Sequence, residues 1–212
     1  MQLTPPEDVM FAVMCAPAGS YYGAFMKSFA GVVPLDYDRA APKGSGSYKV
    51  SGNYALTFKP YAIAHQQGYM ELLFLNSATH EYVDEFGSSN FFGIKGNRYI
   101  TPLSESVLPS ITNKTLQEVA KDLGMTVEKR PVPVEELAEF DEVGACGTAV
   151  VITPISHIDI KEHLEEDAVK QTFRYTEDGV VGPVSEKLYK RITAIQKGEI
   201  EDTHGWCYEV KF

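Results

Sequence analysis

Short apolar runs separated by Gly, Pro and Asn recur along the whole chain, and this pattern most constrains the fold. Apolar runs of about four to eight residues between turn residues predict β-strands, whereas apolar residues three and four positions apart predict helices. Both kinds of segment alternate along the 212 residues. The sequence therefore predicts a mixed α/β or α+β fold, and the pattern alone does not choose between the two.

The predicted strands share an apolar run bounded by turn residues. They cover residues 9–15, 29–37, 72–75, 82–85, 91–95, 98–101, 126–132 and 150–153. The dipeptide Gly96-Asn97 separates two of them and is typical of a tight hairpin. Residues 38–46 are polar and rich in Gly and Pro, which predicts a loop just before Lys49.

Four segments have the spacing or composition of helices, at residues 53–67, 112–123, 134–140 and 185–197. The clearest is 112–123, where Leu116, Val119 and Leu123 follow helical spacing and Gly124 provides a stop. Pro60 lies inside the first helix and predicts a kink there. The charged, aperiodic segment 163–178 is predicted to be an exposed insertion in a single domain covering residues 1–212.

Composition excludes several classes of partner. The formal net charge is -10, and an acidic surface disfavours both nucleic acid and anionic membranes, because each requires clustered Lys and Arg. The three cysteines form no C-x-x-C pair and the histidines have no metal-ligand spacing, so no metal site is predicted. Without a long apolar run or a signal-peptide pattern, a cytoplasmic location is expected.

Three features suit an anionic ligand or an aldehyde. Ser110-Ile111-Thr112 precedes the clearest helix, whose free N–H groups could bind phosphate; the simpler interpretation is that Thr112 or Asn113 caps the helix. Small residues at 144–149 would let a ligand approach the backbone, or would pack a strand entry. Lys49 could form a Schiff base if its pKa is depressed, although most lysines near loops are solvated charges.

Taken together, these features resemble one family. The matching motifs, in order, are DRAAP (38–42), GSG (44–46), Lys49 with GNYA (52–55), YVDE (82–85) with NFF (90–92), TP (101–102) with LPSIT (108–112), GTA (147–149), and LY, IQKG and DTHGW within 188–206. This succession is similar to that of branched-chain amino-acid aminotransferases, which are fold-type IV enzymes that use pyridoxal 5′-phosphate. The resemblance implies the larger domain of that fold, a pseudo-barrel of strands flanked by helices.

The resemblance also implies roles for individual residues. Lys49 would be the catalytic residue that holds the cofactor and moves a proton at the substrate α-carbon. Tyr54 would hydrogen-bond the phenolic oxygen of the cofactor, Glu85 would pair with its pyridine nitrogen, and Leu108 would pack on its ring. Asn90 matches the family pattern and is predicted to have a structural role.

The phosphate and the substrate would be bound by backbone and hydroxyl groups. Ile111 and Thr112 would donate to the cofactor phosphate, as would Thr148. The backbone of Thr148 and Ala149 would face the substrate carboxylate. No metal and no nicotinamide cofactor would be needed.

The implied reaction transfers the amino group of leucine, isoleucine or valine to 2-oxoglutarate, giving a branched 2-oxo acid and glutamate. The small-molecule amino acids and 2-oxo acids would be the ligands, and the family suggests a homodimer. Two alternatives remain: another fold-type IV enzyme, such as a D-amino-acid aminotransferase or aminodeoxychorismate lyase, or a catalytically impaired module that keeps the fold and binds the cofactor.

The sequence departs from the family in two respects. Family members carry an α+β domain before the segment that begins here, so we expect an exposed apolar patch where that domain would lie, and self-association through it. Ser110 stands where the family usually has glycine, and serine is tolerable there only if φ is negative.

Overall fold

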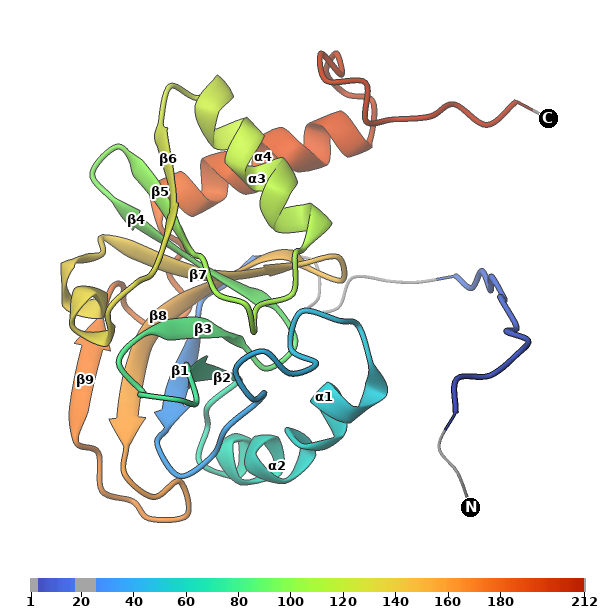
Figure 1. The fold of residues 1–212 in the computed structure, drawn as a ribbon. Coiled ribbons are helices and arrows are strands. Elements are labelled where there is room, and N and C mark those ends of the chain that lie inside the picture. Colours follow the sequence, from blue (N-terminus) through green and yellow to red (C-terminus); the bar gives the residue numbers. More distant parts are fainter. Residues whose placement is uncertain (1–3, 18–25, 212) are drawn as a thin grey trace.

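The computed structural model describes residues 4–17 and 26–211. Nine strands form one sheet, in the order β3-β2-β1-β8-β7-β4-β5-β6 with β9 beside β8, and an additional pairing joins β3 to β4. This last pairing closes six of the strands, β3, β2, β1, β8, β7 and β4, into a barrel (Figure 1). The predicted pseudo-barrel with flanking helices is therefore confirmed.

The barrel is mixed in strand direction. β1 (Phe29–Pro34) lies parallel to both β2 (Glu71–Leu75) and β8 (Val151–Lys161). β3 (Val83–Phe86) and β4 (Asn90–Lys95) are antiparallel and pair at one position, Glu85 opposite Asn90. β4 also pairs with β7 (Glu142–Gly147), which pairs with β8.

β5 (Arg98–Pro102) and β6 (Thr126–Arg130) extend the sheet beyond the barrel. The hairpin from β4 to β5 turns at Gly96, whose φ of +57° suits glycine. Aliphatic and aromatic side chains fill the barrel, including Phe86, Phe91 and Ile158, each at most 1% exposed. This interior gives the closed sheet its main stabilisation, because burying each such side chain is worth about 2 kcal/mol.

Helices cover the barrel on two sides. α3 (Ile111–Asp122) and α4 (Pro183–Gln196) lie together at the top of Figure 1 and bury Leu116, Leu188 and Ile192 against the sheet. α1 (Ser51–Ala55) and α2 (Phe58–Gln66) lie near β2 at the opposite end, and a 3-10 helix, η1 (Val134–Glu139), follows β6.

The start of α4 depends on a side chain from β7. Gly182 at the N-cap position supplies no side-chain cap. Instead, the buried carboxylate of Glu142 accepts the N–H groups of Val184 and Ser185, each at 2.8 Å. A Cβ on Gly182 would lie 2.6 Å from Glu142 Cγ, so glycine is required for this close approach.

Several predicted elements differ from the structure. The helix predicted over 53–67 is two helices, with the break at Leu56 and Thr57, and Pro60 lies in the first turn of α2, where a missing N–H costs little. The strand predicted over 150–153 is longer, because β8 continues to Lys161. Residues 9–15 are not a strand: they have no pairing partner and their apolar side chains, such as Met10 and Phe11, are exposed.

The segment 163–178 is only partly an exposed insertion, so this prediction is corrected. Most of its residues are exposed. However, β9 (Gln171–Arg174) pairs with β8, and both Leu164 and Phe173 are buried in the core. A single apolar residue in a polar edge strand gives too weak a periodic signal to be detected from sequence.

Candidate active site

Lys49 lies at the end of a loop that a buried asparagine holds in shape. Asn53, in α1, donates through Nδ2 to the carbonyl oxygens of Ser45 (2.8 Å) and Tyr48 (2.9 Å), while Ser45 Oγ donates to Asn53 Oδ1 (2.7 Å). Since Asn53 is 5% exposed, these bonds are shielded from water and fix the backbone just before Lys49.

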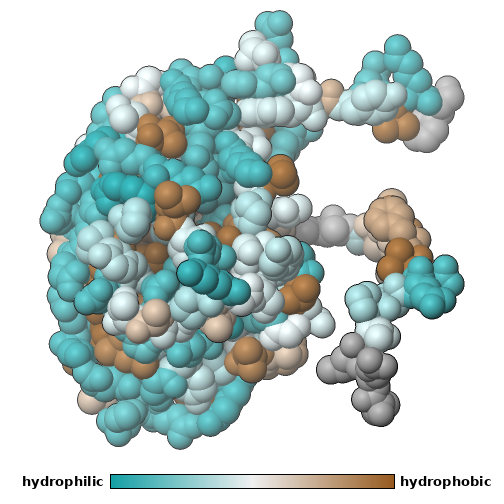
Figure 2. Space-filling view, viewed as in Figure 1, coloured by the Kyte–Doolittle hydropathy of each residue, from teal (hydrophilic) through white to brown (hydrophobic). Residues whose placement is uncertain are grey.

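The Lys49 side chain is exposed, and its Nζ lies 4.8 Å from the centre of the Tyr54 ring. Neighbouring apolar side chains are also exposed, namely Tyr48 (66%), Val50 (42%), Leu56 (66%) and Phe58 (70%). The surface in Figure 2 is otherwise largely hydrophilic, with separate apolar groups. These four side chains are close to Lys49 in the chain. The apolar patch expected where the family's preceding domain would lie stays a prediction.

Glu85 is buried at the point where the barrel closes, with 4% of its surface exposed. Its carboxylate accepts hydrogen bonds from Asn90 Nδ2 and from the N–H of Leu108 (3.3 Å), and forms an ion pair with Arg39 at 3.1 Å. Burial raises the pKa of Glu85 to about 7, while Arg39 opposes this rise. A further cation beside the carboxylate would favour the ionised form.

The loop that carries Lys49 is packed against the loop that carries Leu108. Arg39 donates to the carbonyl oxygen of Ser106 as well as pairing with Glu85. Gly46 touches the same backbone, and a Cβ there would lie 2.9 Å from Ser106 Cα. The loop with the lysine, the buried acid and the segment leading to α3 are therefore held as one unit.

The N-terminus of α3 presents unpaired backbone donors. Ser110 has φ of -59° and caps the helix by accepting the N–H of Asn113 at 3.2 Å. The cap is thus Ser110, not Thr112 or Asn113 as the simpler interpretation had it, and its negative φ meets the condition for a serine here. Within the described residues, the N–H groups of Ile111 and Thr112 have no hydrogen-bond partner, as an anion site at a helix N-terminus requires.

The turn between β7 and β8 carries the remaining predicted residues. Thr148 and Ala149 are exposed in this turn. Val151 follows with φ of 69°, and Ile152 N–H donates to the Val150 carbonyl at 2.9 Å. A β-branched residue in this region is strained, so the conformation of the turn is imposed by the strands on either side.

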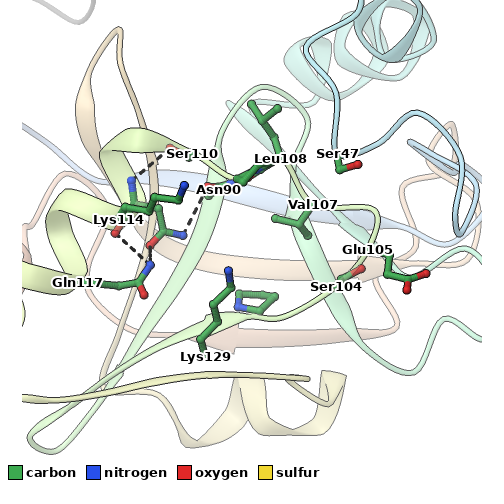
Figure 3. Close-up of a pocket in the computed structure, with 13 residues that line it drawn as sticks. Ser47, Asn90, Ser104, Glu105, Val107, Leu108, Ser110, Lys114, Gln117 and Lys129 are labelled. Atoms are coloured by element: carbon green, nitrogen blue, oxygen red, sulfur yellow. Dashed lines mark hydrogen bonds between the residues drawn. The ribbon is translucent and has the colours of Figure 1, made fainter.

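A pocket of about 330 Å³ adjoins these groups, between α3, β6 and the loop before α3 (Figure 3). Leu108 is the one predicted site residue that lines it; the others there include Lys114, Gln117 and Lys129. The pocket therefore lies beside the predicted site and does not coincide with it. The candidate site is instead the linked unit of the Lys49 loop, Glu85 and the segment before α3, and Lys49 within it is open to solvent.

The donor set fits pyridoxal 5′-phosphate. An accessible amine suits an aldehyde, a buried carboxylate suits a protonated ring nitrogen, and unpaired helix N–H groups suit a phosphate. Sequence reasoning gave no role in the site to Arg39, Asn53 or Asn113. The first two belong to motifs that were recognised, but only the fold reveals that their side chains are buried and what they contact.

Within residues 4–17 and 26–211, no group of three or more His, Cys, Asp or Glu side chains could hold a metal ion. Over the same residues, no helix has the length and apolar character to cross a membrane.

The fold is that of class IV aminotransferases. A family model described as amino-transferase class IV matches residues 15–158, and the chain belongs to that family. It is 41% identical to the branched-chain-amino-acid aminotransferase of Haemophilus influenzae, over 98% of this chain and 60% of the relative. It is 40% identical to that of Helicobacter pylori, over 97% of this chain and 58% of the relative.

Solved structures agree with these sequence matches. The branched-chain amino acid aminotransferase of Escherichia coli superposes with a TM-score of 0.74 at 30% identity, covering 90% of this chain and 59% of that chain. The enzyme of Thermobaculum terrenum, solved in its PLP-bound holo form, gives a TM-score of 0.70 at 28% identity, covering 87% of this chain and 55% of that chain. This chain thus spans less than two thirds of the length of these relatives.

Proposed function

We propose that this chain is the cofactor-binding part of a branched-chain aminotransferase. It would bind pyridoxal 5′-phosphate through Lys49 and transfer the amino group of leucine, isoleucine or valine to 2-oxoglutarate. The observation that supports this most directly is the linkage of three groups in one hydrogen-bonded unit: the loop before Lys49, the buried Glu85 and the N-terminus of α3. The names of the relatives indicate the substrate class.

Each predicted residue would have a distinct task. Lys49 Nζ would hold the cofactor and, once an amino acid displaces it, move the proton at the substrate α-carbon. Glu85 would keep the ring nitrogen protonated. The bound cofactor supplies an electron sink for the charge left on the α-carbon.

Binding groups surround this centre. Tyr54 would hydrogen-bond the phenolic oxygen, and Leu108 would pack on the ring. Ile111, Thr112 and Thr148 would hold the phosphate, and the backbone of Thr148 and Ala149 would orient the substrate carboxylate. Since Lys49 is exposed, exclusion of water at this face requires a further polypeptide. We propose a homodimer that covers the exposed apolar side chains near Lys49 in the chain, which size-exclusion chromatography would test.

The test is an absorbance titration of the purified chain with pyridoxal 5′-phosphate. We expect wild type to gain the visible band that follows attachment of a lysine amine to the aldehyde, and Lys49→Ala to lack it. Lys43→Gly is the matched control, because it removes a lysine from the same loop at a residue with φ of 56°, where glycine is unstrained. A band that persists in Lys49→Ala would refute the assignment.

Activity is then measured with leucine and 2-oxoglutarate. Formation of glutamate that depends on Lys49 supports the transaminase. Cofactor binding without turnover of leucine would favour an impaired binding module, and turnover of D-amino acids would favour another enzyme of the same fold.

A further inference from the structure

The first turn of α3 contains a buried amide that contacts β4 and β5 of the sheet. Asn113 is 6% exposed. Its Oδ1 accepts from Tyr99 Oη at 2.9 Å, and its Nδ2 donates to Thr101 Oγ1 at 2.8 Å and to Asn90 Oδ1 at 3.4 Å. Each polar atom of this side chain is thus used, as a buried amide requires.

A second amide continues the connection to the acid of the site. Asn90 is 3% exposed, and its Nδ2 donates both to Glu85 and to the Leu108 carbonyl at 3.1 Å. Asn90 therefore connects Asn113 directly to the carboxylate. In Figure 3, Asn90 lies between the loop at Leu108 and the first turn of α3.

Packing alone does not account for this arrangement. Burying an amide costs free energy unless all its hydrogen bonds are made, and asparagine is a poor residue within a helix. An apolar side chain would fill the same space without that requirement. Hydrogen bonds from the two amides are directional. They therefore fix the distance between Glu85 and the helix turn that bears the free N–H groups of Ile111 and Thr112.

We propose that Asn113 is a positioning residue which, through Asn90, joins the phosphate-binding turn of α3 to Glu85, so that both ends of the cofactor are held by one hydrogen-bonded unit. This inference rests on the proposed function. The binding energy of the phosphate and that of the ring nitrogen are realised together only if the spacing between their partners is fixed. Without the connection through Asn90, the cofactor could not place its phosphate and its ring nitrogen in their best positions at the same time.

The test is a double-mutant cycle that combines Asn113→Ala with Glu85→Gln. We expect Asn113→Ala alone to weaken binding of pyridoxal 5′-phosphate about tenfold, which corresponds to the loss of one network hydrogen bond. In the Glu85→Gln background, Asn113→Ala should weaken cofactor binding only about threefold or less, because Asn90 then no longer connects Asn113 to a carboxylate. An equal cost in both backgrounds would overturn the proposal.

Tyr99→Phe is the matched control. It also removes one hydrogen bond to Asn113, but on the side away from Glu85, so its effect on binding should be small and additive with Glu85→Gln. If Asn113→Ala does not fold, Asn113→Ser replaces it, since the shorter side chain cannot reach Asn90.

The same double-mutant cycle is also measured by urea unfolding of the cofactor-free chain. We expect the two substitutions together to shift the midpoint by clearly less than the sum of their separate shifts, and additive shifts would overturn the link itself. A wild-type chain that gains no Lys49-dependent band would refute the proposed function, while the unfolding cycle would still decide whether the link exists.

Discussion

Glu85→Gln should remove a pH dependence from the stability of the cofactor-free chain. Glu85 is 4% exposed, and burial raises its pKa from about 4.5 to about 7. Arg39, the Leu108 N–H and Asn90 oppose this rise, and Asp84 adds to it. The net effect is that the folded chain binds this proton more tightly than the unfolded chain does.

The sign and the size follow from linkage. The contribution of Glu85 to stability is fully present below about pH 4.5 and is lost as the pH rises through about 7, because ionised Glu85 is disfavoured only in the folded chain. The pKa of Glu85 differs by about 2.5 units between the folded and unfolded chain. At about 1.4 kcal/mol per pKa unit, this changes the free energy of unfolding by roughly 3 kcal/mol.

The assay is urea unfolding followed by far-ultraviolet circular dichroism at pH 5 and pH 8, without cofactor. We expect wild type to lose roughly 2 to 3 kcal/mol more than Glu85→Gln between these conditions. Titrating groups that do not interact with Glu85 contribute equally to both proteins and cancel. Glu105→Gln, on an exposed residue of the neighbouring loop, should behave as wild type. If wild type and Glu85→Gln change equally, Arg39 already compensates the charge and the reasoning is wrong.

Two glycines give further predictions. Gly182→Ala should destabilise the chain by about 2 kcal/mol or more, because its Cβ would displace Glu142 from the start of α4; thermal unfolding would measure this, and an unchanged midpoint would contradict it. Gly46→Ala should push apart the two loops that meet at Ser106 and weaken pyridoxal 5′-phosphate binding about tenfold. Gly52→Ala is its control, since no atom lies within 4 Å of the added Cβ.

The sequence was most informative where a periodic apolar pattern coincided with a turn residue. α3 ends within one residue of its predicted end, and Gly124 follows it with φ of +77°. β8 was underestimated because Asp159 and Lys161 interrupt its apolar pattern. Both are buried: Tyr69 donates to Asp159 at 2.6 Å, and Lys161 donates to Gln67 at 2.6 Å. Partners distant in sequence satisfy these groups, so a local pattern could not reveal them.

In the candidate site, too, local motifs were predictable from the sequence and long-range contacts were not. Lys49, Tyr54 and Glu85 were predicted from motifs that are recognisable in a single sequence. The positions of Arg39 and Asn113 depend on long-range contacts: Arg39 reaches Ser106 and Glu85, while Asn113 reaches Asn90. Residues 9–15 show the converse, since an apolar run alone does not make a strand: in the structure these residues pair with no strand.

The closure of the barrel has a consequence for folding. The turn from β3 to β4 joins residues close in sequence, whereas β1 pairs with β8 between Phe29 and Ile155. Loop-closure entropy therefore delays the β1–β8 ladder until after the local hairpins have formed. Arg39 follows β1 and Glu85 lies in β3, so their ion pair also joins segments that are distant in sequence. The pairing of Arg39 with Glu85 therefore forms only when these distant segments have come together, and it is a marker of the native topology.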